Sequence, residues 1–179
     1  MPQSPPDNAM GPDTETKPDI ETKKVSVTLK LMTGYQFQVD FGDAGQLITD
    51  EPPPLGDNAG PNPSKLLIAA VANCLGASLL FAVHKFNEDA GPISARVEGV
   101  MTRAQSAATT PGGRSKGRWR ISHIDVTLKL GNASVNESRL ARALSQFEDF
   151  CVVTQSVRQG IDITVNVEDA RGQLIDKTH

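Results

Sequence analysis

The sequence predicts an α+β fold with antiparallel sheets, from the order and spacing of its apolar residues. Segments that alternate apolar and polar residues with period two, as strands do, follow one another around residues 24–49 and 93–130. One long segment, residues 63–86, has the three- and four-residue spacing of a helix instead. Because strands and helices do not alternate one by one, a doubly wound parallel sheet is not expected.

Composition places the chain among ordinary globular proteins. It has 179 residues, 38% of them hydrophobic and 22% charged, and a net charge of −3. That charge gives no electrostatic reason to expect nucleic acid or an anionic membrane as a partner. The longest apolar run, residues 66–83, is interrupted by Asn73 and Ser78, so we expect no membrane span. The N-terminus lacks a signal-peptide pattern, and we expect a cytoplasmic protein.

The chain is expected to form a single domain with two tails. Residues 1–23 are rich in Pro, Asp, Glu, Thr and Lys, and such a segment cannot bury enough apolar surface to offset its ordering entropy. We therefore predict a mobile N-terminal tail at 1–23, one domain at 24–170 and a C-terminal tail at 171–179.

The first strands form a predicted hairpin. Residues 24–31 alternate so that one face of the strand is apolar, which predicts a half-buried strand. A turn at Thr33-Gly34 leads to a second alternating segment, residues 35–41. Residues 46–49 predict a short third strand, and 51–63 a loop rich in proline.

A long helix should follow this loop. Asn62 is a good N-cap, and Pro63 suits the first helical position. The helical spacing puts Cys74 on the apolar face. Because few charges occur between Lys65 and Lys85, we expect the helix to be covered on most sides.

Further strands are predicted at residues 93–102 and 117–130, and a final one at 161–167. The loop between the first two is rich in Gly, Ser and Thr.

Two shorter helices are predicted before the final strand. The segment from Ser134 to Glu137 matches a capping box, which predicts a helix running to about Phe150. A second helix is expected over residues 151–159, with Gly160 as its C-terminal cap.

The two cysteines, Cys74 and Cys151, are the candidate reactive groups. A zinc site needs about four ligands, and the three histidines, His84, His123 and His179, show no CxxC or HxxxH spacing with them. A Cys-His nucleophile would have to be assembled in space, since nothing local in the sequence indicates one.

Redox chemistry is a third possibility for the two thiols. Cys151 opens a predicted helix, where the backbone N–H groups would stabilise a thiolate. Cys74 lies in the middle of a helix on an apolar face, and burial there would raise its pKa. The competing interpretation is that both are buried cysteines acting as small hydrophobic side chains. Spacing alone leaves these alternatives open.

The chain resembles the OsmC/Ohr family of osmotically inducible and organic hydroperoxide resistance proteins, in its OsmC-like branch. Residues 60–74, Gly-Pro-Asn-Pro followed by a Leu/Ala-rich helix ending in Cys74, are similar to the family's first cysteine helix. Residues 151–157 are similar to its second, C-x-V-[ST]. The resemblance covers about residues 24–168. It implies an α+β, OsmC-like fold in which antiparallel sheets wrap around central cysteine-bearing helices in an intertwined homodimer.

The resemblance also implies a chemistry. Cys74 would attack an organic hydroperoxide and become a sulfenic acid, and Cys151 would then form a disulfide with it. An external dithiol, dihydrolipoamide-like in the family, would reduce the pair. No metal or organic cofactor is expected.

Two family features are missing. The reductases use an Arg from the N-terminal sheet to stabilise the attacking thiolate, and a Glu that orients it. Here no Arg precedes Arg96, and Ser64 stands at the position of the Glu. The candidate substitutes for these two roles are Lys30, Lys65, Arg96 and Arg103 as the cation, and Glu51 as the orienting carboxylate.

The missing ion pair motivates an alternative function. An OsmC-like protein without peroxidase activity would keep the fold and bind a small hydrophobic ligand, or sense oxidation.

Overall fold

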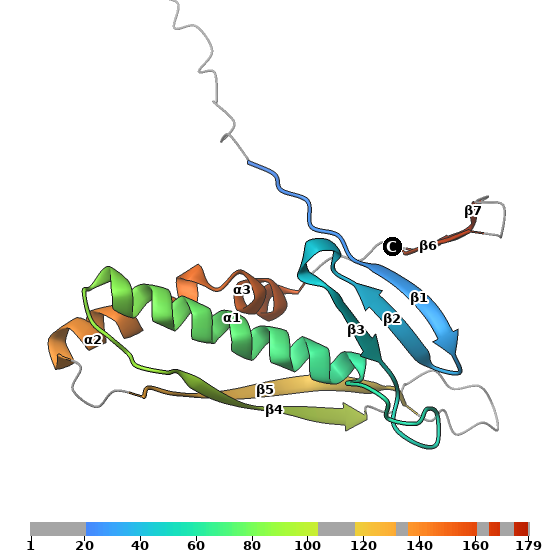
Figure 1. The fold of residues 1–179 in the computed structure, drawn as a ribbon, viewed down its shortest axis with the longest axis horizontal. Coiled ribbons are helices and arrows are strands. Elements are labelled where there is room, and N and C mark those ends of the chain that lie inside the picture. The colour runs from blue at the N-terminus through green and yellow to red at the C-terminus, as the bar shows by residue number, and fades with distance from the viewer. Residues whose placement is uncertain (1–20, 104–116, 132–135, 161–164, 169–173, 179) are drawn as a thin grey trace, which may run out of the picture.

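A computed structural model of the chain shows an α+β fold with antiparallel sheets, as the sequence predicts (Figure 1). It describes residues 21–103, 117–131, 136–160, 165–168 and 174–178. The strands are β1 (Thr28–Thr33), β2 (Gln36–Asp40), β3 (Gln46–Thr49), β4 (Ser94–Arg103), β5 (Trp119–Lys129), β6 (Val165–Glu168) and β7 (Leu174–Thr178). The helices are η1 (Gly42–Ala44), α1 (Pro63–Lys85), α2 (Glu137–Leu144), η2 (Phe147–Phe150) and α3 (Val152–Gln159).

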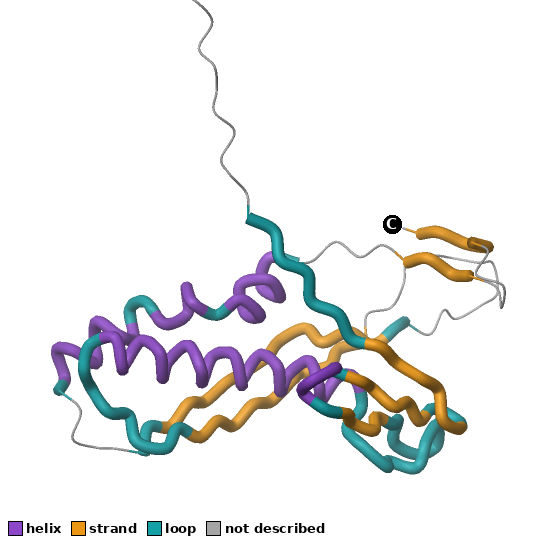
Figure 2. The backbone as a smooth tube through the Cα atoms, turned by 45° about the horizontal axis from the view of Figure 1, so that its top comes forward, coloured by secondary structure: helices purple, strands orange, loops and turns teal. Residues whose placement is uncertain are grey.

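The long helix α1 is the centre of the structure. One side of it lies along the two-stranded β4-β5 sheet, and α2, η2 and α3 pack on another side (Figures 1 and 2). The N-terminal sheet, in the order β1-β2-β3, lies near the N-terminal end of α1 (Figure 1). The core follows this arrangement: its buried residues come mainly from α1 and the elements on both sides of it.

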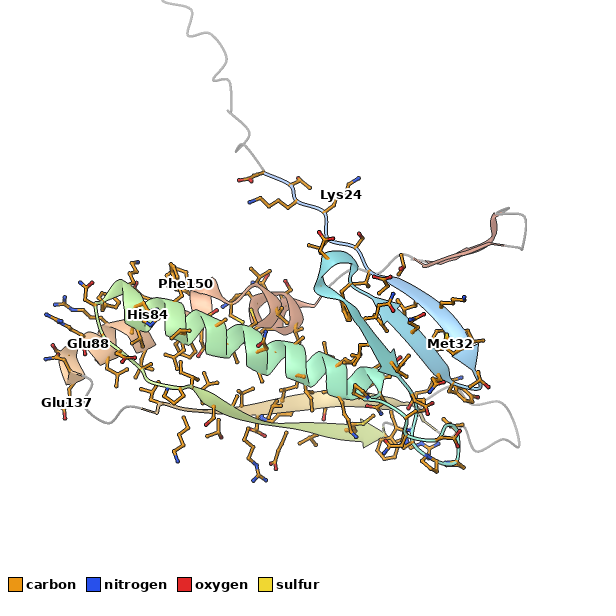
Figure 3. All side chains as sticks on the ribbon, in the orientation of Figure 1. Lys24, Met32, His84, Glu88, Glu137 and Phe150 are labelled. Atoms are coloured by element: carbon orange, nitrogen blue, oxygen red, sulfur yellow. The ribbon has the colours of Figure 1, made fainter. Side chains whose placement is uncertain are left out.

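The N-terminal hairpin and the third strand are confirmed. β1 pairs with β2, and β2 with β3, both antiparallel. The expected half-burial of the first strand is wrong in the single chain, since β1 begins only at Thr28 and all six of its residues are exposed. Its apolar Leu29 and Leu31 are 58% and 55% exposed, because nothing in the described part of the chain covers that face. Met32 lies on the same sheet, away from α1 (Figure 3).

The start of α1 is confirmed. The Asn62 side chain accepts a hydrogen bond from the Lys65 backbone N–H at 3.0 Å, and Pro63 is the first helical residue. The expectation that the helix is covered on most sides is wrong for the single chain. Leu80 and Phe81 are 38% and 56% exposed, because the sheet and the short helices cover only part of its circumference.

By length and composition, α1 would be able to cross a membrane, contrary to the expectation from its interrupted apolar run. Core helices of soluble proteins meet the same criteria. Here seven residues of α1 are buried against the rest of the chain: Val71, Ala72, Leu75, Ser78, Leu79, Ala82 and Val83. The helix is therefore part of the core of this fold.

The predicted strands of the second sheet form one long antiparallel pair, β4 with β5. The register shifts between Val100 and Met101, where Ser122 is the extra residue of a bulge. On the two sides of the bulge, Ile121 and Ile124 are both half-buried, although they are three residues apart. The bulge thus keeps the apolar side chains on the side that faces α1.

The two short helices differ from the prediction at their ends. The N-cap of α2 is Asn136, whose side chain accepts from the Arg139 N–H at 3.2 Å, and not Ser134, which lies outside the described residues. α2 ends at Leu144 rather than near Phe150, and η2 follows. α3 begins at Val152 with Cys151 as its N-cap, and Gly160, at φ +81°, follows its end as predicted.

The final predicted strand is partly described. Residues 161–164 lie outside the described part, and β6 begins at Val165. It pairs antiparallel with β7, which falls within the segment expected as a C-terminal tail.

A buried carboxylate holds the loop that leads into α1. Asp50, 3% exposed, accepts hydrogen bonds from the backbone N–H groups of Glu51, Asp57 and Ala59. These bonds, chiefly the one from Ala59, outweigh burial and lower the pKa of Asp50. Close by, a Cβ on Gly60 would overlap the Ile48 carbonyl, so only glycine allows the loop to pack this tightly on β3.

Replacing Asn62 tests how far the N-terminus of α1 depends on its capping side chain. Asn62→Ala leaves the Lys65 N–H without its acceptor and should lower the free energy of unfolding by about 1 kcal/mol. Urea unfolding followed by circular dichroism measures the change. Asn62→Asp keeps an acceptor and should stay close to the original stability. Equal losses in both variants would contradict a capping role.

Candidate functional site

The two cysteines meet where α3 packs on the middle of α1. Cys74 lies halfway along α1, and Cys151 caps the N-terminus of α3. Both belong to one apolar cluster with Val71 and Leu75, in which Cys151 is 0% exposed and Cys74 is partly buried. Their thiols are close enough to share a hydrogen bond, and both are free. The sequence left open whether these residues meet, and the fold brings them together.

The N-terminus of α3 binds both sulfur atoms. The Thr154 backbone N–H donates to the Cys151 sulfur at 3.4 Å, and the Val153 backbone N–H donates to the Cys74 sulfur. The Thr154 hydroxyl oxygen lies 2.9 Å from the Cys151 sulfur. Backbone N–H groups and the dipole at a helix N-terminus favour negative charge, so this position favours a thiolate.

The two thiols differ in how easily they ionise. Burial raises the pKa of the Cys74 thiol, and so does Cys151, by its hydrogen bond and its charge. Burial also acts to raise the pKa of Cys151, but hydrogen bonds from Cys74 and Thr154 outweigh it and leave that pKa below its ordinary value. The pair therefore reaches its singly ionised form with the charge mainly on Cys151.

Two hydroxyl side chains complete the cluster, and neither was predicted from the sequence as a site residue. Ser78, 6% exposed, lies one helical turn after Cys74 and hydrogen-bonds to both sulfurs. Thr154, 8% exposed, bonds to Cys151 alone. A buried serine one turn from a cysteine on an apolar helix face was the available signal.

An apolar pocket of about 580 Å³ borders the cysteine cluster. It lies between the N-terminal half of α1, strand β5 and the segment from η2 to α3. Its lining residues are Leu67, Val71, Leu75, Ile121, Ser122, His123, Ile124, Val126, Leu128, Phe147, Glu148, Thr154, Val157 and Arg158. Arg158 is paired with Glu148 at 2.7 Å, so the charges in the lining largely compensate each other. The pocket suits an apolar molecule of small size.

The single chain does not bring the candidate cations to Cys74. Arg96 pairs with Glu98 at 2.6 Å on β4, where its side chain is 79% exposed. Arg103 donates to the Gly117 carbonyl and lies over the Trp119 ring.

The other three candidates belong to the N-terminal part of the chain. Lys30 is exposed on β1, Lys65 is exposed in the first turn of α1, and Glu51 is half-buried in the loop. The strongest influences on the pKa of Cys74 come instead from burial, Cys151, Val153 and Ser78.

Two of the three histidines are described, and both are exposed; His179 lies outside the described residues. His84 is exposed in the last turn of α1, toward the end of the molecule where Glu88 lies (Figure 3). His123 is exposed on β5 and hydrogen-bonded to Asp125 at 3.2 Å. Within the described ranges, no three His, Cys, Asp or Glu residues come together as a metal site would require.

Comparison with known proteins finds one family model, described as OsmC-like protein, which matches residues 56–166. No curated protein sequence matches the chain.

Solved structures share the fold at low sequence identity. An OsmC-like protein from Mycoplasma pneumoniae is 18% identical, with a TM-score of 0.55 over 79% of this chain and 91% of its own. A putative osmotic stress induced and detoxification response protein from Psychrobacter arcticus is 16% identical, with a TM-score of 0.55 over 75% and 89%. An organic hydroperoxide resistance protein from Legionella pneumophila is 19% identical, with a TM-score of 0.51 over 79% and 95%.

Removing the Ser78 hydroxyl tests its contact with the thiols. Ser78→Ala should raise the pKa of both Cys74 and Cys151, because the hydroxyl stabilises each thiolate. The pH dependence of alkylation at each cysteine, followed by mass spectrometry, measures the shift. Ser156→Ala, a hydroxyl on α3 that makes none of these bonds, is the matched control and should leave both values unchanged. An unchanged profile in Ser78→Ala would contradict the contact.

Proposed function

This chain belongs to the OsmC-like protein family, and on that basis we propose that it is a thiol-dependent peroxidase that reduces organic hydroperoxides through Cys74 and Cys151. The observation that carries the proposal is the convergence of the two cysteines at the N-terminus of α3. A resemblance to hydroperoxide resistance proteins adds the substrate class.

The first step would be oxidation of Cys74. Its sulfur attacks the terminal oxygen of the hydroperoxide, an S–O bond forms, and the O–O bond breaks with release of the alcohol. Cys74 is the more accessible thiol, since Cys151 is 0% exposed and Cys74 only partly buried. The neighbouring apolar pocket would receive the organic part of the peroxide.

The second step would close a disulfide. The Cys151 sulfur attacks the Cys74 sulfenic acid, the S–S bond forms, and the hydroxyl leaves as water once protonated. The lowered pKa of Cys151 suits this attack, because the thiolate is the nucleophile. An external dithiol, itself oxidised to a disulfide, would return both cysteines to the reduced state.

The active form would be a homodimer. Apolar side chains are left exposed along α1 and β1, among them Leu80 at 38%, Phe81 at 56% and Leu29 at 58%. A contiguous apolar surface marks an interaction site in soluble proteins, and a dimer interface would bury these side chains. A second copy would cover these faces and would also bring its own cations toward the first copy's thiols. In this assembly the activating roles proposed from the sequence would fall to Lys30, Lys65, Arg96, Arg103 and Glu51.

We also propose a cytoplasmic location, where reducing conditions would keep the thiols ready to react.

A second candidate is supported by the raised pKa of Cys74. Burial and Cys151 both raise it, and no cation ranks among its strongest influences. The chain would then be a non-peroxidatic OsmC-like protein that binds a small hydrophobic ligand in the 580 Å³ pocket, or that senses oxidation.

Reaction with one equivalent of cumene hydroperoxide separates the two candidates. A peroxidase should consume the peroxide and form a Cys74–Cys151 disulfide, seen by mass spectrometry after thiol alkylation. Cys74→Ser should abolish consumption, whereas Ser145→Ala, whose hydroxyl donates to the Arg142 carbonyl rather than to a sulfur, should not. If the peroxide stays intact and both thiols of the original protein stay free, the peroxidase function is contradicted and the binding function is supported.

The oligomeric state follows from the exposed face of α1. Sedimentation should show a dimer, and Phe81→Glu should shift it to the monomer, because a charge would be buried in the interface. Ser94→Glu adds the same charge at an exposed position of β4 and serves as the control. A monomer in the original protein, or a dimer that tolerates Phe81→Glu, would argue against this interface.

A further inference from the structure

We propose that the Cys151 thiolate is the base that removes the proton from Cys74 while Cys74 attacks the peroxide. The inference rests on the proposed function and goes beyond it, since it gives Cys151 a task before any disulfide forms. Within the described single chain Arg96 and Arg103 are paired elsewhere, and a base within the same chain would make Cys74 nucleophilic without them.

Few groups near Cys74 on its own helix would stabilise its thiolate. Its helix carries no other ionisable side chain between Lys65 and His84. Partial burial among Val71, Leu75 and Cys151 disfavours a charged sulfur. A nucleophile in such surroundings is normally activated by an adjacent base within hydrogen-bond reach.

Cys151 has the contacts of such a base. The Thr154 N–H at 3.4 Å and the Thr154 hydroxyl oxygen at 2.9 Å surround its sulfur. When Cys151 is ionised, both groups donate to it. The Cys74 thiol is a further donor to the Cys151 sulfur, so the proton to be removed lies in the hydrogen bond between the nucleophile and the base. Ser78 bonds to both sulfurs and keeps the two aligned.

The surrounding charges do not provide a competing base in the described part of the site. From η2, α3 and β5, the charged or titratable side chains that reach the adjacent pocket are Glu148, Arg158 and His123. Glu148 is paired with Arg158, and His123 is hydrogen-bonded to Asp125. Cys151 is the ionisable group that shares a hydrogen bond with Cys74.

The step balances. The Cys74 S–H bond breaks and Cys151 takes the proton, while the Cys74 sulfur forms a bond to the terminal peroxide oxygen. The O–O bonding electrons leave with the alkoxide, which then receives the proton from Cys151 and departs as the alcohol. Cys151 is again a thiolate, ready to attack the sulfenic acid and release hydroxide.

The test is the rate of the first oxidation alone, measured as Cys74 sulfenic acid plus disulfide formed in a single turnover with cumene hydroperoxide. Cys151→Ser keeps a good N-cap for α3 but removes the base. At neutral pH its Cys74 should oxidise roughly 100-fold more slowly, the usual range for loss of a positioned base. If Cys151 only resolves the sulfenic acid, this rate will not change, and the inference is overturned.

The pH profile gives a second, distinct readout. In the original protein the rate should rise with pH through the lowered pKa of Cys151 and then level off. In Cys151→Ser the rate should keep rising until Cys74 ionises unaided, so the two proteins should converge at high pH. A parallel rate deficit at every pH would indicate a structural loss instead and would overturn the inference.

Two variants of Thr154 and one peroxide-free assay complete the design. Thr154→Val removes the hydroxyl that stabilises the base and should slow the first oxidation, while Thr154→Ser should restore it. Iodoacetamide alkylation of Cys74 needs the same activation but no peroxide, and should slow likewise in Cys151→Ser at neutral pH. If Cys151→Ser slows alkylation but the original protein does not react with peroxide, the proposed function is wrong and Cys151 still acts as the base. If Cys151→Ser leaves the alkylation rate unchanged, Cys151 is not the base.

Discussion

The contact between the N-terminus of α3 and the middle of α1 is the interaction on which the site depends. α3 begins at Val152 with Cys151 as its N-cap, so its free backbone N–H groups point at the two sulfurs rather than at water. Unsatisfied N–H groups at a helix start need acceptors, and a thiolate is a charged one. The same packing that satisfies the helix therefore makes the two thiols unequal. When the pair carries one negative charge, that charge is favoured on Cys151, and Cys74 keeps its proton.

The rest of the fold holds this contact in place. The Asp50 carboxylate and the tight packing of Gly60 fix the loop that starts α1, and the β4-β5 sheet supports the opposite side of the helix. The faces left exposed, on β1 and along α1, are apolar. They correspond to the faces for which the sequence predicts burial, and a second copy of the chain would provide it.

Much of the fold could be predicted from the sequence because local signals agree with it. Asn62-Pro63 marks the start of α1, and period-two alternation marks the strands of both hairpins. Burial of β1 and of α1 was overestimated because sequence periodicity reports which face is apolar, not which chain covers it. The N-cap of α2 was misplaced because Ser134 and Asn136 are both good caps, and the choice between them depends on tertiary packing.

The site was only half predictable for a related reason. The cysteines stand out by their rarity and by their resemblance to a family pattern, but Ser78 and Thr154 are common residues whose roles depend on one close packing contact. The electrostatic preference for Cys151 could be inferred from its place at a helix start. The raised pKa of Cys74 follows from burial on a helix face, which the sequence also indicated.

The central claim is that the reduced pair holds its first negative charge on Cys151. Titration of the protein with ¹³C-labelled cysteine Cβ atoms, observed by NMR, follows each thiol separately, and Cys74→Ser assigns the signals. The account predicts that the Cys151 signal moves first, below the ordinary thiol pKa of about 8.5, and the Cys74 signal later, above it. A Cys74 signal that moves first would contradict the account.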